Sequence, residues 1–337
     1  MRLLFFLLFF NNLLKIIDKT NEMKYNCNKN IVKRRGGTVS KIMKTTKITK
    51  KTWKDIGFVA ALVSIPILQF LIFYVFINGN VILLAFQKEN NAFTFDNFHF
   101  LFRYFGSSNS TLLEALVNTL KFFALQIVMF PVSLLFSYFL YKKIFLHRYL
   151  QIVFFLPSII SAMVMVTLFK NIMNGPVAEI WATIFGLQNQ PLFFDSTRYA
   201  LKSIMVYMVW TGLANNMVIF SGTMARVPAE ILESGKMDGV GFWRELVQLV
   251  VPLIWPTIST LILLQFIGIF TASGPILLFT QGKWGTYTIS YWIYEYTVVM
   301  HNYNYASAAG LFFTVIGLPV IYVAKYFLNK LDKNVEY

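Results

Sequence analysis

The sequence predicts an all-α polytopic membrane protein with six transmembrane helices. Of its 337 residues, 57% are hydrophobic and only 13% are charged, whereas a soluble domain carries about 25% charged residues. The charged residues are also unevenly placed, because they leave six long uncharged runs and cluster between them. Composition therefore excludes an ordinary soluble domain and favours the membrane class.

Each uncharged run is long enough for one spanning helix, since about 20 residues cross roughly 30 Å of hydrocarbon. The runs cover residues 56–87, 122–141, 149–169, 203–225, 246–282 and 296–324. We expect the helices near residues 57–77, 121–141, 149–172, 203–224, 252–273 and 306–327. Interior prolines are compatible with these spans, because neighbouring helices satisfy the carbonyl groups that a proline frees.

The basic residues set the predicted orientation. With residues 1–19 left aside, the N-terminal tail placed inside and the helices alternating, twenty Lys and Arg fall on the inner side and seven on the outer side. Basic residues that flank spans are retained in the cytoplasm. We therefore expect both termini and the segment 226–252 to be cytoplasmic, in a multi-pass protein of the cell membrane that contacts the lipid bilayer.

The N-terminal segment, residues 1–55, is predicted to precede the first span. Residues 24–54 hold eleven Lys or Arg and no acidic residue, which is typical of a solvated tail and of a juxtamembrane anchor. A basic tail before a span is ordinary, so we expect no nucleic-acid partner. For residues 1–22, three interpretations stay open: an interfacial helix, a weak signal-like segment, or sequence upstream of a misassigned start, with Met23 or Met43 as initiator.

Residues 56–112 are expected to form the first transmembrane helix and the longest outer loop. Aromatic residues are frequent in the loop: Phe93, Phe95, Phe98, Phe100, Phe102 and Tyr104. Such residues can cap the helical bundle or lie at the lipid headgroups. Either role is favoured over ligand binding.

Groups that could support covalent chemistry are sparse. The three histidines lie far apart without metal-ligand spacing, Cys27 is the single cysteine, and no phosphate-binding loop is present. We therefore expect no catalytic residues, no metal site, no cofactor and no nucleotide site. The predicted spans also lack the charged residues that usually couple ion flow to transport. A stand-alone channel, a secondary transporter and a membrane scaffold stay open as alternatives.

Uncharged polar residues lie inside the predicted spans. Asn215 and Asn216 are in the fourth span and Gln265 is in the fifth. These side chains could form interhelical hydrogen bonds, or they could line a pathway for a hydroxyl-rich solute. Asn215 and Asn216 are the strongest pathway candidates, because adjacent amides cannot both face one neighbouring helix.

The charged segment between the fourth and fifth spans has the pattern of two helices joined by a turn at Asp238 and Gly239. Pro228 suits a first helical position, and the helix dipole favours Glu230 and Glu233 in the first turns. Gly239 is suited to a positive φ that ends the helix. Pro252 is expected to begin the fifth span.

This segment resembles the cytoplasmic loop of membrane subunits of binding-protein-dependent ABC importers. That loop reads E-A-A, three residues, G, nine residues, I, one residue, L-P. Glu233-Ser234-Gly235 stands for E-A-A, Gly239 is the glycine, and Leu249 to Pro252 stand for the end. The spacing matches in full, while the identities match in part. The small residues Ser234 and Gly235 would permit close approach by another surface.

Two further motifs support the resemblance. Asn118-Thr119-Leu120 resembles the opening of the family's core domain, and Tyr305-Ala306-Ser307-Ala308 resembles the segment before the last span of sugar-type permeases in the maltose and glycerol-phosphate class. The sequence departs from the sugar group at residues 280–284, which read Thr-Gln-Gly-Lys-Trp instead of Thr-x-Gly-Gly-Pro. The departure bears on the solute rather than on the fold.

The resemblance implies a type I ABC importer bundle of the MetI-like class. It implies a core domain over residues 113–328, a docking loop over 226–252 and a cytoplasmic tail over 329–337. The partners would be a second permease subunit, two ATP-binding subunits that hydrolyse ATP, and an extracytoplasmic solute-binding protein. The cargo would be a sugar or oligosaccharide, with a non-sugar solute as the alternative. The implied docking residues are Glu230, Glu233, Ser234, Gly235, Asp238, Gly239 and Pro252.

Overall fold

The computed structural model describes residues 61, 63–88, 90, 92–107 and 110–331. The chain divides into two compact units, Met1–Leu83 and Leu84–Tyr337, and each is considered by itself. The described part is helical, apart from an isolated antiparallel bridge between Gln87 and Phe93. The prediction of an all-α protein is confirmed for these residues, whereas the expectations for residues 1–60 lie outside them.

The first unit contributes most of an apolar helical segment, Val63–Ala85, which is long enough to cross a membrane. The segment includes a π-helical stretch, η1 (Leu71–Phe76), and α3 (Ile77–Ala85). It extends eight residues beyond the predicted end at residue 77. The extension includes Asn78, whose side-chain amide donates to the Tyr74 carbonyl at 2.7 Å. This polar side chain therefore finds a hydrogen-bond partner within its own helix.

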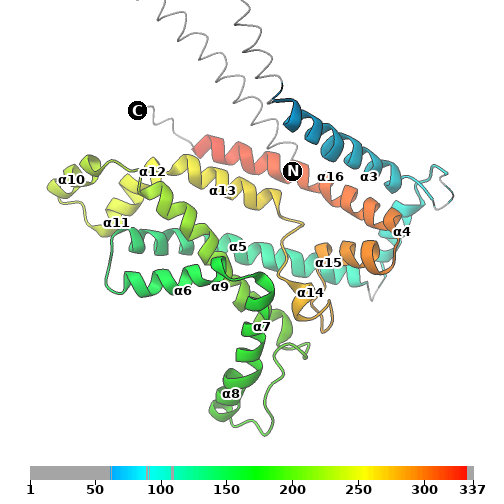
Figure 1. The fold of residues 1–337 in the computed structure, drawn as a ribbon, viewed down its shortest axis with the longest axis horizontal. Helices are drawn as coiled ribbons and strands as arrows, with labels where there is room; N and C mark the ends of the chain where they lie inside the picture. The colour runs from blue at the N-terminus through cyan, green and yellow to red at the C-terminus, as the bar shows by residue number, and fades with distance from the viewer. Residues whose placement is uncertain (1–60, 62, 89, 91, 108–109, 332–337) are drawn as a thin grey trace, which may run out of the picture. The chain divides into compact units, whose positions relative to one another are not determined.

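The second unit contains the remaining helices (Figure 1). The first half has α4 (Asp96–Phe105), α5 (Thr111–Tyr141), α6 (His147–Ile159), α7 (Ala162–Ile172), η2 (Met173–Val177), α8 (Ala178–Phe185) and α9 (Ala200–Met224). The second half has α10 (Ala229–Met237), α11 (Phe242–Arg244), η3 (Glu245–Val250), α12 (Val251–Leu253), α13 (Trp255–Ile267), α14 (Ile276–Phe279), α15 (Ile289–Tyr294), η4 (Glu295–Val299) and α16 (Tyr303–Leu331).

Four described helical segments are long and apolar enough to span a membrane: Val63–Ala85, Thr111–Tyr141, Ala200–Met224 and Tyr303–Leu331. Two bent pairs, His147–Pro157 with Ala162–Phe185 and Phe242–Leu253 with Trp255–Ile267, raise the number to six if each pair is one span. The third and fifth spans were each predicted as one helix, near residues 149–172 and 252–273, because an uncharged run carries no information about bends.

The two bends have local causes. Ile160 and Ser161 have extended backbone with ψ of 143°, which separates α6 from α7. In the fifth span the break is at Ile254, and the two helical parts meet at 76°. Pro256 follows in the first turn of α13, where a missing N–H costs nothing, whereas a continuous helix could not accommodate its ring. The helix α13 therefore begins at Trp255, whereas Pro252, the predicted start of the span, lies in α12 on the other side of the bend.

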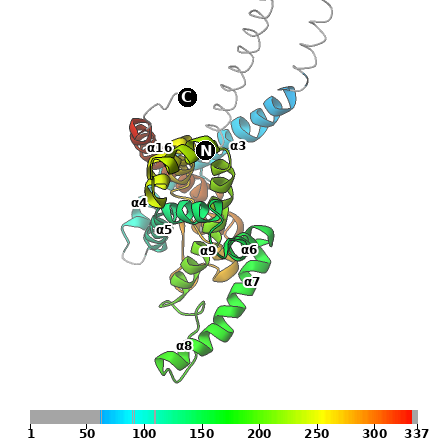
Figure 2. The same cartoon turned by 90° about the vertical axis from the view of Figure 1, so that its left-hand side faces the viewer.

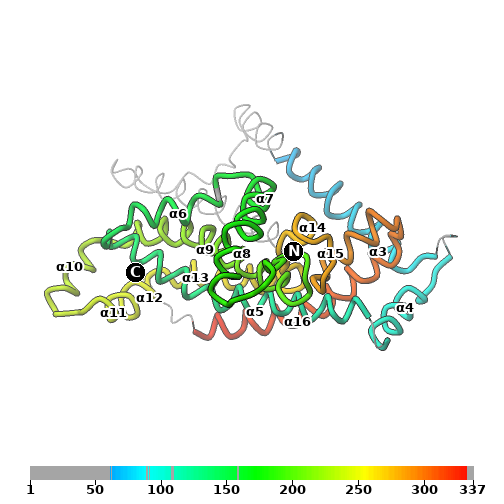
Figure 3. The backbone as a smooth tube through the Cα atoms, turned by 90° about the horizontal axis from the view of Figure 1, so that it is seen from below, coloured from blue at the N-terminus to red at the C-terminus, as the bar shows by residue number. Residues whose placement is uncertain are grey.

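Helices α5, α9, α13 and α16 run alongside one another in the second unit (Figures 1 and 3). Helices α7 and α8 extend away from them (Figure 2). Within this unit, α10 to α12 lie at one end of the long helices, and α4 and α15 lie at the other (Figure 3). Three clusters of buried apolar residues follow this axis, one at each end and one between α5, α7, α9 and α14.

The aromatic residues of the predicted outer loop pack on the second unit. Phe100 stacks on Tyr305 with ring centroids 4.1 Å apart, and Phe102 meets Phe312 edge to face at 5.5 Å. Aromatic contacts between α4 and α16 therefore cap this end of the bundle, which is one of the two roles that the sequence left open.

Candidate functional site

The segment that resembles a docking loop forms a short helix, a glycine turn and a second helix. α10 ends in a Schellman motif, in which the Val240 N–H donates to the Gly235 carbonyl at 2.9 Å and the Gly239 N–H donates to the Lys236 carbonyl at 3.0 Å. Gly239 has φ of +73°. The predicted turn and its positive-φ glycine are confirmed. α10 begins at Ala229, so Pro228 is the N-cap residue, one position before its predicted place.

The two faces of α10 differ in burial. Glu230, Glu233 and Ser234 are exposed, as are Asp238 and Gly239 in the turn. Three of these five residues, Glu230, Glu233 and Asp238, are acidic, and the segment that carries them projects from the helical bundle (Figure 1). This face is therefore available to a partner.

Gly235 lies on the buried face of α10. A β-carbon at this position would lie 2.6 Å from Leu249 Cδ1. The close approach predicted for the small residues is therefore made within the chain, where Leu249 occupies the volume that the family's alanine side chain would fill. Ser234 remains exposed, and Pro252 lies at the start of the short helix that precedes the bend.

Residues 226–252, called the docking segment below because of their resemblance to a docking loop, are anchored to the long helices by an apolar cluster. Leu232 of α10 and Leu246 of the following helix are buried with Tyr138 of α5 and with Phe220 and Met224 of α9. The segment is therefore packed on the bundle on one side and exposed on the other.

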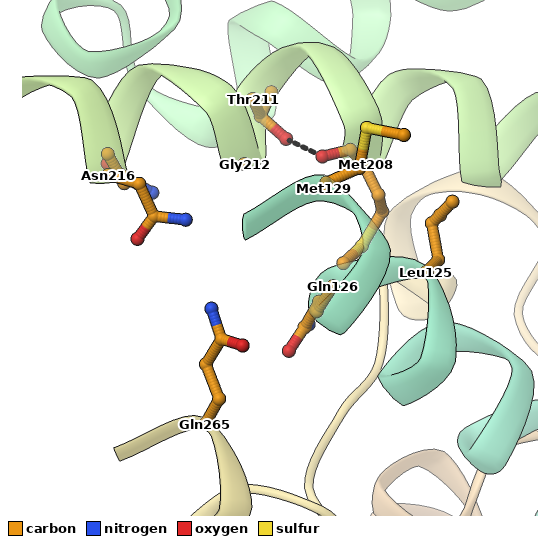
Figure 4. A pocket seen from close by; sticks show the side chains of 9 residues that line it. Leu125, Gln126, Met129, Met208, Thr211, Gly212, Asn216 and Gln265 are labelled. Carbon is orange, nitrogen blue, oxygen red and sulfur yellow. Dashed lines mark hydrogen bonds between the residues drawn. The ribbon is translucent and has the colours of Figure 1, made fainter. Parts of the chain in front are cut away.

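A cavity of about 270 Å³ lies between α5, α9 and α13. It is lined by Leu125, Gln126, Met129, Met208, Thr211, Gly212, Asn215, Asn216 and Gln265. The three residues predicted for the solute pathway are thus brought together by two helices. Figure 4 shows the amides of Asn216 and Gln265 pointing toward one another across the cavity.

A second cavity of about 290 Å³ shares three residues with the first: Gln126, Asn216 and Gln265. The shared amides lie where the two cavities meet. The Gln265 Oε1 atom is buried and has no hydrogen-bond partner. An unpaired buried acceptor is costly unless a ligand or water completes it, so this oxygen is suited to receive a hydroxyl group.

Gln126, an uncharged polar residue of the second predicted span, was not among the residues predicted for the solute pathway. The structure places Gln126 on the face of α5 that lines the same cavity as Asn216 of α9. Sequence spacing within α5 does not show which of its faces meets α9.

The Asn118-Thr119 motif has a structural role at the other end of α5. The Asn118 side-chain amide donates to the carbonyls of Gly285 and Tyr287, both at 3.0 Å. The Thr119 hydroxyl accepts from the Ile289 N–H at 3.0 Å. Both side chains are buried. Together they hold the segment that leads into α15 against α5.

Comparison with known proteins identifies the family. Residues 127–337 match the model of the binding-protein-dependent transport system inner membrane component. Protein LplB of Bacillus subtilis (strain 168) is 25% identical over 236 residues, covering 67% of this chain and 73% of that protein. The arabinooligosaccharides transport system permease protein AraP of the same organism is 24% identical over 297 residues, covering 84% and 93%.

A solved structure shows the same fold. One chain of a bacterial alginate ABC transporter, in complex with an alginate pentasaccharide-bound periplasmic protein, superposes with a TM-score of 0.71. The two sequences are 23% identical, and the match covers 84% of this chain and 99% of that chain. The predicted MetI-like permease fold is confirmed by this likeness.

The family match includes the docking segment, the fourth to sixth predicted spans and both amide-bearing helices α9 and α13. The predicted resemblance to importer permeases is thereby confirmed, and with it a multi-pass protein of the cell membrane. Since the family model covers more than half of the sequence, the chain belongs to the inner membrane components of binding-protein-dependent transport systems.

Proposed function

We propose that this chain forms half of the solute pathway of an ATP-driven importer for a neutral sugar or oligosaccharide. The observation that carries the proposal is the combination, within one family match, of an exposed docking segment and an amide-lined cavity between the spans. The chain converts motion of its partners into alternating access and performs no covalent chemistry itself.

The exposed face of α10 and its turn form the docking surface for an ATP-binding subunit. The residues available for contact are Glu230, Glu233, Ser234, Asp238 and Gly239. Gly235 lies on the opposite, buried face of α10, where it packs against Leu249. Pro252 precedes the bend at which the docking segment joins the fifth span. Movement of α10 would therefore be transmitted to α13, which carries Gln265 into the cavity.

The cavity favours an uncharged, hydroxyl-rich solute. Among the described residues that line the two cavities, the polar groups are amides and hydroxyls and none is ionisable. Amides donate to and accept from sugar hydroxyls but cannot neutralise a carboxylate or phosphate. The names of AraP and of the alginate transporter support a saccharide cargo, and the lining favours a neutral one on this chain's side of the pathway.

The complete assembly would contain a second permease subunit, two ATP-binding subunits and an extracytoplasmic solute-binding protein. We place six spans across the membrane, with each bent pair as one span and both termini in the cytoplasm. The basic-residue count supports this orientation, and it puts the docking segment on the side where ATP is available.

Copurification tests the proposal. The full chain, expressed with its partner subunits, is expected to retain an ATPase through purification. In proteoliposomes, ATP turnover should rise only when the loaded binding protein is added, and a mixture of neutral di- to pentasaccharides should be taken up. Uptake without any ATPase, or uptake driven by an ion gradient, would favour a channel or a secondary transporter and would overturn the proposal.

A further inference from the structure

One buried ion pair joins the docking segment to the second predicted span. Lys142, directly after α5, contacts the Oε1 atom of Glu245, which lies four residues beyond the N-cap of α11. The Glu245 side chain is 6% exposed and the Lys142 side chain is 20% exposed. Neither residue belongs to the exposed docking face or to the cavity.

Glu245 borders an apolar cluster, and its polar neighbours are Lys142 and the Tyr138 hydroxyl. Leu246 and Val250 follow it in the same helix and are buried in the cluster at this end of the bundle. A carboxylate taken out of water in such a place is costly unless it is paired, and removing one partner leaves an uncompensated buried charge. The contact with Lys142 is therefore a specific link between two segments rather than a surface contact.

Neighbouring contacts restrict the geometry of this link. The Tyr138 hydroxyl donates to the Phe242 carbonyl at 3.4 Å, and the Lys142 ammonium lies 5.7 Å from the centre of the Tyr138 ring. The Phe242 ring stacks on Phe139 with centroids 5.5 Å apart. The end of α5 and the start of the second docking helix thus meet through an ion pair, a hydrogen bond and ring contacts.

The other end of this connection is the cavity. Gln126 lies in α5, sixteen residues before Lys142, which corresponds to about 24 Å along a helix. Since α5 is continuous from Thr111 to Tyr141, a displacement applied at Lys142 reaches the cavity through a single helix. Pro131 lies between the two positions and is where such a helix can bend.

We propose that the Lys142–Glu245 pair is a strut that makes the docking segment and α5 move as one body, so that ATP-driven motion of α10 reaches Gln126 as well as Gln265. Lys142 and Glu245 are positioning residues in this scheme, since neither touches ATP nor solute. The inference rests on the proposed docking of an ATPase. It adds a second route from the docking segment to the cavity, besides the direct route through the bend into α13.

Substitution separates coupling from docking. In the complete complex, Glu245→Gln should leave the ATPase bound, while ATP turnover stimulated by the loaded binding protein falls at least tenfold. The reversed pair, Lys142→Glu with Glu245→Lys, should recover at least half of the wild-type stimulation. Lys143→Met is the matched control, because Lys143 is the exposed neighbour, and it should behave as wild type.

Three other results would contradict the proposed coupling, the proposed role of the pair as a strut, or the proposed function. Wild-type stimulation in Glu245→Gln would show that the pair is not needed for coupling. Loss of the ATPase from Glu245→Gln without recovery in the reversed pair would show that it only maintains the docking surface. Failure of the wild-type chain to retain any ATPase would instead count against the proposed function itself.

A chemical cross-link distinguishes a strut from a latch that must open. Lys142→Cys and Glu245→Cys can be combined in a Cys27→Ser background, because Cys27 is the only cysteine of the sequence. Before cross-linking, this variant lacks the ion pair, so its stimulated ATP turnover should be as low as that of Glu245→Gln. A short bis-methanethiosulfonate should then join the two positions through disulfides and restore turnover and uptake of neutral oligosaccharides, and reduction should remove this recovery. Turnover that is normal before cross-linking, stops on cross-linking and returns on reduction would show that the pair is not needed and that the two segments must separate, and would overturn the proposal.

Discussion

The two ends of α5 are attached to the rest of the second unit by different kinds of contact. At one end, Asn118 and Thr119 make neutral hydrogen bonds to backbone groups of residues 285–289. At the other end, Lys142 pairs with the side chain of Glu245, and Tyr138 and Phe139 contact Phe242. In the first attachment, side chains bond to backbone groups, which every residue has. In the second, side chains contact other side chains, so the attachment depends on the identity of both partners.

The difference indicates that the two ends of α5 have different functions. Backbone acceptors stay in place when the side chains around them change, so the Asn118 end is suited to a fixed support. A charge pair beside an apolar cluster is strongly dependent on both partners, so the Lys142 end is suited to transmitting a movement. We therefore expect substitutions at the Asn118 end to lower stability and substitutions at the docking end to lower transport.

The largest effect is expected from Gly239→Trp at the docking end. Gly239 has φ of +73°, a conformation that side chains rarely adopt, and no atom lies within 4 Å of a β-carbon placed there. The substitution should strain the turn and obstruct the docking face, so that transport is abolished while the protein still inserts. Uptake assays beside a membrane-insertion assay measure the two properties.

Gly239→Asn is the matched control, because asparagine tolerates this backbone region better than other residues with side chains. It should retain most of the transport activity. Normal uptake by a stably inserted Gly239→Trp protein would contradict both the docking role and the contrast between the two ends.

The next effect is expected from Asn118→Ala at the opposite end. The alanine leaves the partly buried carbonyls of Gly285 and Tyr287 without their donor. A fully buried group left unsatisfied costs about 1–3 kcal/mol, so each of these should cost at most that. Thermal unfolding of the purified protein should shift downward, while ATPase binding is retained. Leu120→Ala, two positions along and exposed, is the control, and an equal shift in that variant would remove the special role of Asn118.

A smaller effect is expected midway between the two ends, at the cavity. Asn216→Ala or Gln265→Leu removes one amide from the point where the cavities meet. The net worth of a hydrogen bond is about 0.5–1.5 kcal/mol, or roughly two- to tenfold in solute affinity. Half-saturating solute concentration in the uptake assay should rise by that factor, with stability and ATPase binding unchanged.

Asn215→Ala provides a comparison within the same turn, since Asn215 also lines the first cavity but not the second. Asn215→Ala should raise the half-saturating solute concentration less than Asn216→Ala or Gln265→Leu does. If all three variants lowered stability instead of affinity, the amides would serve interhelical packing rather than the solute.

The sequence predicted the parts of this structure that depend on composition and backbone preference. Lipid thickness fixes the length of α5, α9 and α16, so uncharged runs located them to within about ten residues. The positive-φ requirement at Gly239 is local to the chain, and the turn was therefore predictable. The family resemblance added the docking role, which charges and glycines alone leave open.

The remaining features depend on tertiary packing. The occupation of the space behind Gly235 by Leu249 and the pairing of Lys142 with Glu245 join segments whose faces are unknown until the helices are assembled. The same is true of Gln126, which became a cavity residue through the packing of α5 on α9. The bend at Ile254 had a local signal in Pro256, but an interior proline is also compatible with a continuous span in a bundle, so the proline alone did not predict the bend.

The smallest effect is expected from an exposed ion pair at the Asn118 end, which sharpens the contrast with the buried pair at the docking end. Lys88 Nζ lies 2.5 Å from Asp96 Oδ2, and both side chains are at least half exposed. The bond from Lys88, followed by that from Thr94, lowers the pKa of Asp96. A lowered folded-state pKa contributes stability above the unfolded value of about 3.9, and this contribution is lost as the pH falls through the folded value.

Asp96→Asn should therefore lower the unfolding temperature slightly near neutral pH and leave it unchanged in strong acid, where the wild-type carboxyl is protonated as well. The difference should also shrink in high salt, because water and ions screen an exposed pair. Asp195→Asn, at another exposed acid, is the control in the same pH series. A loss at Asp96 as large as that of Asn118→Ala, or one that persists in strong acid, would mean that this end of the molecule also depends on a specific charge, and the contrast between the two ends would fail.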